Sequence, residues 1–321
     1  MPATTSPPDA SAPLPERAVG LPAVEVPTLL LIIATYAAWV AVTLAYGKWP
    51  LWVVAPVTAV LLTLHSSLQH EILHGHPTRW RGVNRLLAIL PLSLWLPYDR
   101  YREKHLTHHV NDRLTDPLDD PESCYWTPEQ WASLSPIARA LVWVQQTLAG
   151  RFVLGPYWRI PLFLHSEFHA FIANQRGVRA TWLEHVVLCV GVVYWVSYVC
   201  GIPFWLYVVA MVIPGNGILL IRSYAEHRAL PAMRQRTAIV EGSWILGPLF
   251  LFNNLHALHH DEPHVPWYRL PARYRVTRER LIVANAGLVY RTYFEVARRF
   301  LFRPHDLPQH PTGRVPRSRG A

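Results

Sequence analysis

The 321-residue sequence has few charged residues and few cysteines. Charged side chains make up only 16% of the chain, whereas hydrophobic ones make up 51%, which is typical of a membrane protein and argues against a soluble domain. The three cysteines, Cys124, Cys189 and Cys200, include no CxxC pair. A disulfide framework, a thiol redox motif and a CxxC zinc or iron–sulfur site are therefore not expected.

Signals for export and for repeat architectures are also missing. The first 26 residues are rich in Pro, Ala, Ser and Thr, and they lack a basic start followed by an apolar core, so no secretory signal is apparent. We interpret residues 1–26 as a disordered lead. The chain has no internal repeat of fixed period and no long heptad run, which argues against a solenoid or a coiled coil.

Long hydrophobic stretches are what the chain does contain. Residues 27–46 and 49–69 carry no Lys, Arg, Asp or Glu, and each is close to the roughly 20 residues that a helix needs to cross a bilayer. Residues 186–221 are uncharged and long enough for two passes, with an interruption at 201–203, where Pro203 stops the helix. The sequence therefore predicts an all-α integral membrane protein with four transmembrane helices in two hairpins.

The basic residues orient these helices. Lys48 is the only one of the 30 Lys and Arg residues in either short hairpin loop, so the positive-inside rule places both termini on the cytoplasmic side. The net charge of +9 either only fixes this topology and contacts anionic lipid, or also docks an acidic redox partner. Residues 86–97 and 244–252 are apolar but too short to cross, so we expect interfacial or re-entrant helices there.

Three histidine clusters lie just outside the hydrophobic stretches, on the same cytoplasmic side. On a helix, residues three or four apart share a face, so each cluster would present its imidazoles in one direction. Imidazole is the commonest metal ligand and suits iron, zinc, copper or nickel. Eight clustered imidazoles exceed the needs of one ion. The first cluster holds His70 and His74, the second His105, His108 and His109, and the third His256, His259 and His260.

Other interpretations of these histidines explain fewer of them. The first cluster also matches HExxH, in which two histidines bind zinc and Glu71 would activate water in an intramembrane peptidase. Such a site needs one further ligand and leaves most of the remaining clustered histidines without a role. Interfacial histidines that bind nothing are usually single, not clustered at helical spacing. A further HxxxH pair, His165 and His169, follows an amphipathic segment at residues 151–164, and we expect it to be a surface pair.

The order of the clusters, HxxxH, HxxHH and HxxHH, resembles that of the membrane fatty acid desaturase and hydroxylase superfamily. The resemblance covers most of residues 28–275, with one pair of spans before the first cluster and the other before the third. It implies a cytoplasmic helical cap that carries a histidine-rich site with two irons. It also implies a ninth ligand, His227, because the desaturase branch places an extra metal-binding histidine just past the fourth span.

Two positions depart from the pattern of related desaturases. Acyl-CoA desaturases often carry an asparagine four residues before the extra histidine, which holds a metal-bound water, and here this position is Ser223. Asn253 or Asn254 could supply an amide from another direction. Glu71 stands where the desaturase branch commonly has aspartate, and either carboxylate could orient an imidazole by accepting its free N–H. Further candidates for this orienting role are Glu226, Asp112 and Asp261.

The resemblance implies an O2-dependent diiron oxidase that acts on a lipid acyl chain. A fatty acid desaturase of an acyl lipid or acyl thioester is favoured, with no catalytic residue beyond the metal centre. A hydroxylase or ketolase of a lipid, carotenoid or hydrocarbon would use the same histidines, and a non-catalytic haem or metal carrier is a further alternative. No flavin or dinucleotide fingerprint and no haem domain is apparent, so a separate ferredoxin, rubredoxin or cytochrome-type protein would supply electrons.

These inferences define the expected organisation of the chain. We expect a multi-pass integral membrane protein whose termini and histidine clusters face the cytoplasm and which has no nucleic-acid partner. Residues 1–26 would be the disordered lead, residues 27–275 the membrane desaturase-like domain, and residues 276–321 a basic cytoplasmic C-terminal region.

Overall fold

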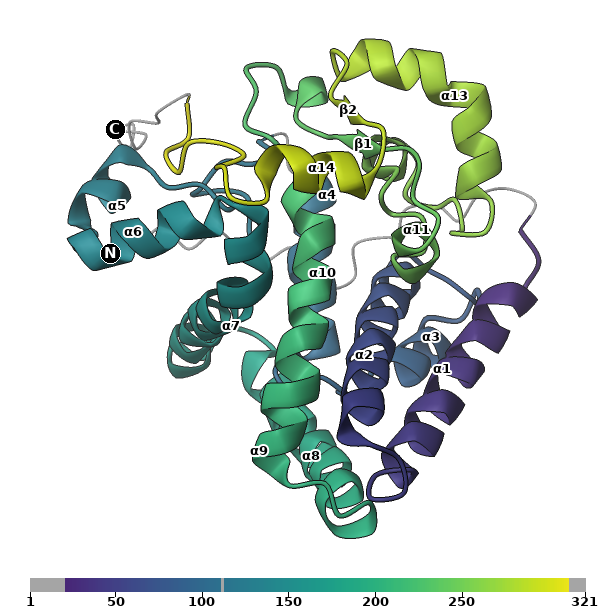
Figure 1. Cartoon of the computed structure of the whole chain (residues 1–321). Coiled ribbons are helices and arrows are strands. Elements are labelled where there is room, and N and C mark those ends of the chain that lie inside the picture. Colours follow the sequence, from purple (N-terminus) through teal and green to yellow (C-terminus); the bar gives the residue numbers. More distant parts are fainter. Residues whose placement is uncertain (1–20, 111–112, 312–321) are drawn as a thin grey trace.

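The computed structural model describes residues 21–110 and 113–311, and these residues are mostly helical (Figure 1). Within these ranges the strands are β1 (Ile239–Val240) and β2 (Val289–Tyr290), which pair in parallel with Ile239 opposite Val289. The predicted all-α class is confirmed. Residues 1–20, most of the predicted lead, lie outside the described residues.

Four helical stretches are long and apolar enough to cross a membrane, as predicted. The first two are α1 (Val26–Leu44) and α2 (Leu51–Leu73). The third consists of α8 (Val178–Tyr194) and the π-helical turn η1 (Trp195–Val199), and the fourth of α9 (Phe204–Tyr207), the π-helical turn η2 (Val208–Val212) and α10 (Ile213–Glu226). The last three stretches run past the predicted apolar segments, and in α2 and α10 this extension places His74 and His227 directly at helix ends.

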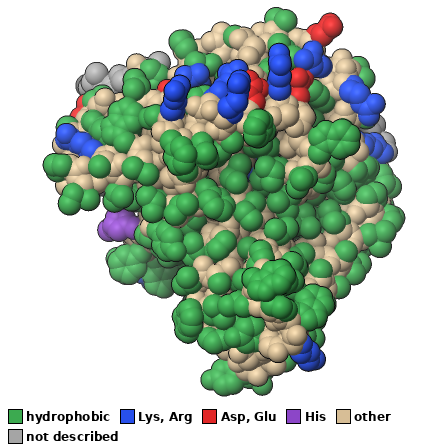
Figure 2. All heavy atoms as spheres, in the orientation of Figure 1, with side chains coloured by type: hydrophobic (Ala, Val, Ile, Leu, Met, Phe, Trp, Pro, Cys, Tyr) green, Lys and Arg blue, Asp and Glu red, His purple; other side chains and the backbone are tan. Residues whose placement is uncertain are grey.

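The spanning helices form one end of the molecule, with α3 and α7 beside them, and most of the remaining elements form a cap at the other end (Figure 1). On the face shown in Figure 2, hydrophobic side chains cover the spans, whereas Lys and Arg side chains gather on the cap. Lys48 lies at the end away from the cap, in the loop between α1 and α2. The charge is thus kept out of the apolar band, as the high cost of charge in hydrocarbon requires.

The segment between the first two histidine clusters enters the bundle of spanning helices. After α3 (Arg81–Ala88), residues 89–97 are not helical, and Leu92 is fully buried in a core with residues from all four spans. Tyr207 donates a hydrogen bond to the Leu92 carbonyl over 2.8 Å, and the His185 ring lies 3.0 Å from the Leu94 carbonyl. These contacts satisfy backbone groups that lipid cannot satisfy. This apolar segment is therefore re-entrant, but the prediction of a helix was wrong for residues 89–97, whose backbone groups bond to the surrounding helices instead.

Four helices connect the re-entrant segment to the third span. They are α4 (Tyr98–Val110), which carries the second histidine cluster, α5 (Pro128–Ser133), α6 (Pro136–Gln145) and α7 (Leu148–Ile172). The hydroxyl of Thr147 accepts the Gly150 backbone N–H and so caps α7. α7 packs closely along α10. Gly217 permits this approach, since a Cβ added there would lie only 2.6 Å from the Phe152 carbonyl oxygen.

The rest of the cap consists of short elements after residue 227. They are η3 (Met233–Gln235), β1, α11 (Leu246–Leu249), α12 (His256–Asp261), α13 (Leu270–Ala284), β2 and α14 (Tyr293–Phe300). The apolar segment at residues 244–252 holds only the short α11 and a turn. The expected boundary at 275/276 falls inside α13, and Tyr290 and Tyr293 share a core with Tyr224 of α10.

Candidate metal centre

The segments that carry the nine histidines meet where the spans join the cap. His70 lies in the last turn of α2, and His74 is the C-cap residue of that helix. The second cluster lies in the second half of α4, α12 begins with His256, and His227 directly follows α10. Within each cluster, the histidines that are four residues apart on a helix project their imidazoles into the same space.

The nine histidines form two groups, and the ligand nitrogens of each group lie within 4.8 Å of one another. Opposite ligands of one ion, with bonds of about 2.1 Å, would lie about 4.2 Å apart, so each group has the dimensions of a metal site. The first group contains His70, His74, His105, His109 and His259, and the second contains His108, His227, His256 and His260.

Neither group corresponds to one cluster of the sequence. On α4, His105 and His109 enter the first group, whereas His108, which faces another side of the helix, enters the second. On α12, His259 enters the first group and its neighbour His260 the second. The rings of His109 and His260 stack with their centroids 4.2 Å apart, so the two groups adjoin.

In the second group, ring nitrogens converge on one point. His227 Nε2 lies 3.1 Å from His108 Nε2 and 2.9 Å from His256 Nε2. The Nδ1 of His108 lies 2.8 Å from a carboxylate oxygen of Asp120 and therefore carries an N–H. The His108 Nε2 is directed at the other rings and, once deprotonated, presents a lone pair to them, as a metal ligand does.

In the first group, several buried nitrogens have no hydrogen-bond partner among the described residues. They are both nitrogens of His74, Nε2 of His105 and Nδ1 of His109. An unsatisfied buried polar group costs about 1–3 kcal/mol, so this arrangement is unfavourable unless the nitrogens bind something. Neutral imidazole nitrogens suit iron or zinc. The residues of both groups therefore fit a bound metal ion.

The comparison with protein families assigns the chain to one family. The family model named Fatty acid desaturase matches residues 47–294, which is more than half of the chain and includes all nine histidines. The chain belongs to the fatty acid desaturase family. No curated protein and no solved structure matches it.

Two carboxylates of this desaturase-family chain orient metal-ligand candidates, and the sequence reasoning did not identify them. Glu122 Oε1 lies 2.7 Å from His105 Nδ1, and Asp120 Oδ1 lies 2.8 Å from His108 Nδ1. Asp120 is itself held by the Thr115 backbone N–H, at 2.7 Å. Each carboxylate fixes a tautomer with Nε2 directed at its group. An acidic run at residues 116–122, soon after the second cluster, was the available signal.

Of the residues that the sequence suggested for orienting an imidazole, some lie beside the histidine groups and others do not. Glu226 lies 3.3 Å from His256 Nδ1 and 2.9 Å from Arg222, so it takes the expected place beside the site. The Asn253 amide lies between the groups, with its oxygen 3.2 Å from His256 Nδ1 and its nitrogen 3.4 Å from His70 Nε2. Asp261 instead pairs with Arg280 on the surface. Asp112 lies outside the described residues.

Glu71 points away from both histidine groups. Its Oε1 accepts a hydrogen bond from the Trp267 backbone N–H over 3.0 Å and lies 4.0 Å from His76 Nε2, while His76 Nδ1 lies 2.8 Å from Glu25. Glu25, Glu71 and His76 make a separate buried group. The peptidase hypothesis based on HExxH requires the Glu71 carboxylate beside a metal-bound water. The Glu71 side chain is instead directed away from the histidine groups.

The local electrostatics favour uncharged rings at most of the ligand candidates, and His108 is an exception. Burial lowers the pKa well below its ordinary value, with neighbouring imidazoles adding to the effect, at His74, His109, His256, His259 and His260. Burial also lowers the pKa of His227, to about 3. Burial lowers the pKa of His108 too, but Glu122 and Asp120 outweigh it and raise the value to about 9. His108 must therefore release a proton to ligate a metal.

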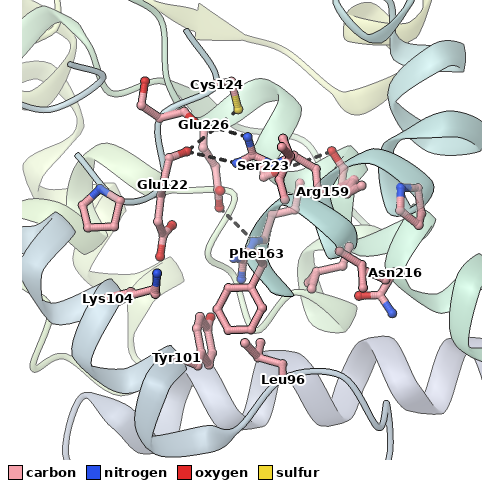
Figure 3. A pocket seen from close by; sticks show the side chains of 18 of the residues that line it. Leu96, Tyr101, Lys104, Glu122, Cys124, Arg159, Phe163, Asn216, Ser223 and Glu226 are labelled. Atoms are coloured by element: carbon pink, nitrogen blue, oxygen red, sulfur yellow. Dashed lines mark hydrogen bonds and ion pairs between the residues drawn. The ribbon is translucent and has the colours of Figure 1, made fainter. Parts of the chain in front are cut away.

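A cavity of about 580 Å³ adjoins the second group. It lies between α2, the re-entrant segment, α4, residues 115–125, α7 and α10, and its wall includes His227, Glu122 and Glu226. Figure 3 shows Tyr101, Phe163 and Leu96 in its apolar part. Ser223, where related desaturases often have asparagine, also lines this cavity. The cavity gives a substrate room beside the candidate metal centre.

The pair His165 and His169 is separate from both groups. The two rings lie on the exposed surface of α7, with their Nε2 atoms 3.2 Å apart. Neither belongs to a group of three or more possible metal ligands among residues 21–110 and 113–311. This placement agrees with the expected surface pair.

Proposed function

We propose that this chain is an O2-dependent oxidase of a lipid acyl chain and that its nine clustered histidines hold two irons. Desaturation is the favoured reaction, with a fatty acid in an acyl lipid or acyl thioester as the substrate. The observation that carries this proposal is the pair of adjoining histidine groups beside a cavity between apolar helices. Membership of the desaturase family supports it.

The roles of the chain's own residues follow from their contacts. When bound, two irons would supply the O2 activation needed to remove hydrogen from an unactivated carbon. The imidazoles supply neutral ligands, and Asp120 and Glu122 hold two of them in the ligating tautomer. Apolar cavity residues such as Phe163 and Leu220 would position a methylene and exclude water from it.

A separate electron donor is part of this proposal, as a ferredoxin, rubredoxin or cytochrome-type protein. The sequence has no apparent motif for a flavin, a nicotinamide cofactor or an iron–sulfur cluster. Lys and Arg side chains gather on the cap (Figure 2). An acidic donor would be steered to such a surface, and its binding would weaken with rising salt.

The reaction can be tested with purified protein, iron, O2, a reduced ferredoxin and a saturated acyl lipid or thioester. We expect a product lighter by two hydrogens, formed more slowly when the attacked methylene carries deuterium. A product heavier by one oxygen derived from labelled O2 would reassign the chain to the hydroxylases. Unchanged lipids, carotenoids and hydrocarbons, with iron bound and donor present, would contradict an oxidase.

We also propose that the cap and both termini face the cytoplasm, because Lys48 is the only Lys or Arg in the two loops at the other end. Cysteine labelling of intact cells tests this in a chain without its three native cysteines. A cysteine at position 48 should react with an impermeant reagent from outside, whereas cysteines near positions 76, 115 and 310, placed at the exposed residues Arg79, Leu118 and Leu307, should not. The reverse pattern would invert the topology.

A further inference from the structure

The cavity beside the candidate metal centre has a cationic end and an apolar end. Figure 3 shows Cys124 and Arg159 toward one end of the pocket and Leu96 and Phe163 toward the other. Arg151 also lines the cavity, and the twelve residues of α7 from Arg151 to Phe163 span about 18 Å along the helix. The cavity is therefore long enough to hold a polar group at one end and an alkyl chain at the other.

Two arginines at the cationic end are fixed against one loop. Arg151 donates from Nη1 to the Cys124 sulfur over 3.2 Å and from Nε to a backbone carbonyl over 3.1 Å. Arg159 donates to the backbone carbonyls of Glu122 and Ser123, both over 3.2 Å. Both guanidiniums thus contact consecutive residues of the loop at 122–124. We call Arg151, Arg159 and Cys124 the arginine site.

Each arginine of the site has a nitrogen that is accessible and not used within the protein. Nη2 of Arg151 and Nε of Arg159 make no hydrogen bond to any residue that the structure describes, and neither is among the fully buried polar atoms. Arg151 as a whole is only 5% exposed, and both residues line the cavity. These N–H groups therefore open onto the cavity, where a bound molecule can accept from them.

The charge of the two guanidiniums is not balanced by a carboxylate. Neither Arg151 nor Arg159 forms an ion pair with an acidic residue in the described part of the chain. Arg100 and Arg222 are similarly buried, but each of them pairs with a glutamate. Arg236 has no such pair, yet all three of its guanidinium nitrogens donate to backbone carbonyls. Because a buried charge is costly unless it is paired, the arginine site favours an anion.

The carboxylates of the cavity wall are engaged elsewhere. Each of them contacts a histidine or an arginine outside the arginine site. They are Asp119, Asp120, Glu122 and Glu226. The Cys124 thiol shows the resulting balance: burial and, less strongly, Asp120 raise its pKa, but Arg159 and Arg151 outweigh them and lower the pKa from its ordinary value. A thiolate there would neutralise at most one of the two guanidiniums.

We propose that the arginine site binds the anionic end of the lipid substrate, a carboxylate or a phosphate, while the acyl chain extends toward Leu96 and Phe163. The N–H groups of a guanidinium match the oxygens of both anions. His227 belongs to the same cavity wall, so a chain held in this way lies beside the candidate metal centre. An uncharged head group would leave the two guanidiniums without an anion. This inference rests on the proposed function for the identity of the ligand as the substrate, but binding itself does not depend on turnover.

Binding without turnover tests the arginine site. Purified protein in detergent, without reductant, would be titrated calorimetrically with dodecanoate, dodecyl phosphate and the neutral dodecanol, and the heat of titration into detergent alone would be subtracted. Wild-type protein should bind at least one of the anions about tenfold more tightly than the alcohol, because charge-assisted hydrogen bonds are roughly twice as strong as neutral ones. Arg151→Met/Arg159→Met should reduce this preference to about threefold or less, because methionine keeps much of the length but none of the charge.

Two further variants guard this test. Arg139→Met is the matched control and should keep the wild-type preference. Like Arg159, Arg139 donates to two successive backbone carbonyls, but it does not line the cavity. Cys124→Asp covers the case in which the double variant misfolds, because its carboxylate would pair with Arg151 and occupy the site from within. This variant should also lose the preference.

The remaining outcomes separate this site from other anion binding. Acetate and inorganic phosphate carry the same kinds of charge without a chain and should bind at least about tenfold more weakly than their dodecyl counterparts. Equal affinity of the short and long anions would indicate a site for a free ion and would overturn the inference. Equal binding of the alcohol and both anions by wild-type protein would also overturn it. So would a preference that survives both Arg151→Met/Arg159→Met and Cys124→Asp, as expected if the anions bind a metal ion instead. Failure of lipid oxidation with the binding preference intact would count against the proposed function alone.

Discussion

Replacing His227 with alanine is expected to abolish turnover and to lower bound iron, even though this residue lies outside the three sequence clusters. Its Nε2 approaches the Nε2 atoms of both His108 and His256, so it occupies the centre of the second group. Removing even an outer partner of a metal ligand commonly costs 10–100-fold in affinity or activity, and we expect a loss of at least about 100-fold here. Alanine at His74, His108 or His260 should have the same effect.

His165→Ala and His169→Ala provide matched controls for these substitutions. Both residues share the HxxxH spacing of the first cluster, yet their rings lie exposed on α7 and belong to neither group. Each variant should retain most of its iron and activity, measured as metal content and product formed per chain. Full loss of iron and activity in His165→Ala or His169→Ala, with both retained in His227→Ala, would show that His227 is not the ninth ligand.

Much of the fold could be predicted because membrane spans leave a strong signal. Uncharged runs of about 20 residues at 27–46 and 49–69 can do little except cross a bilayer, and the structure has spanning helices there. The ends were less predictable. α2 continues to Leu73 and α10 to Glu226, because backbone hydrogen bonding does not stop where charged or polar side chains begin. The path of residues 89–97 into the bundle depends on contacts with Leu92 and Leu94 that composition cannot reveal.

The nine histidines could be found from the sequence, but their division into two groups could not. Helical spacing indicates which imidazoles share a face, and so predicts that His105 and His109 act together. Pairing them with His74 and His259 requires the relative placement of α2, α4 and α12. The orienting carboxylates Asp120 and Glu122 were missed for the same reason, since a loop rather than a helical repeat brings them to their imidazoles.

The metal content of the purified chain tests the central claim most directly. Two adjoining groups of five and four imidazoles predict two iron atoms per chain after purification in mild detergent. Elemental analysis by mass spectrometry, normalised to protein by amino-acid analysis, gives this ratio without any assumption about the substrate. A value near two irons per chain, lost in His227→Ala and kept in His165→Ala, is the expected result. A single zinc ion per chain, with a peptidase activity that Glu71→Gln removes, would contradict the account.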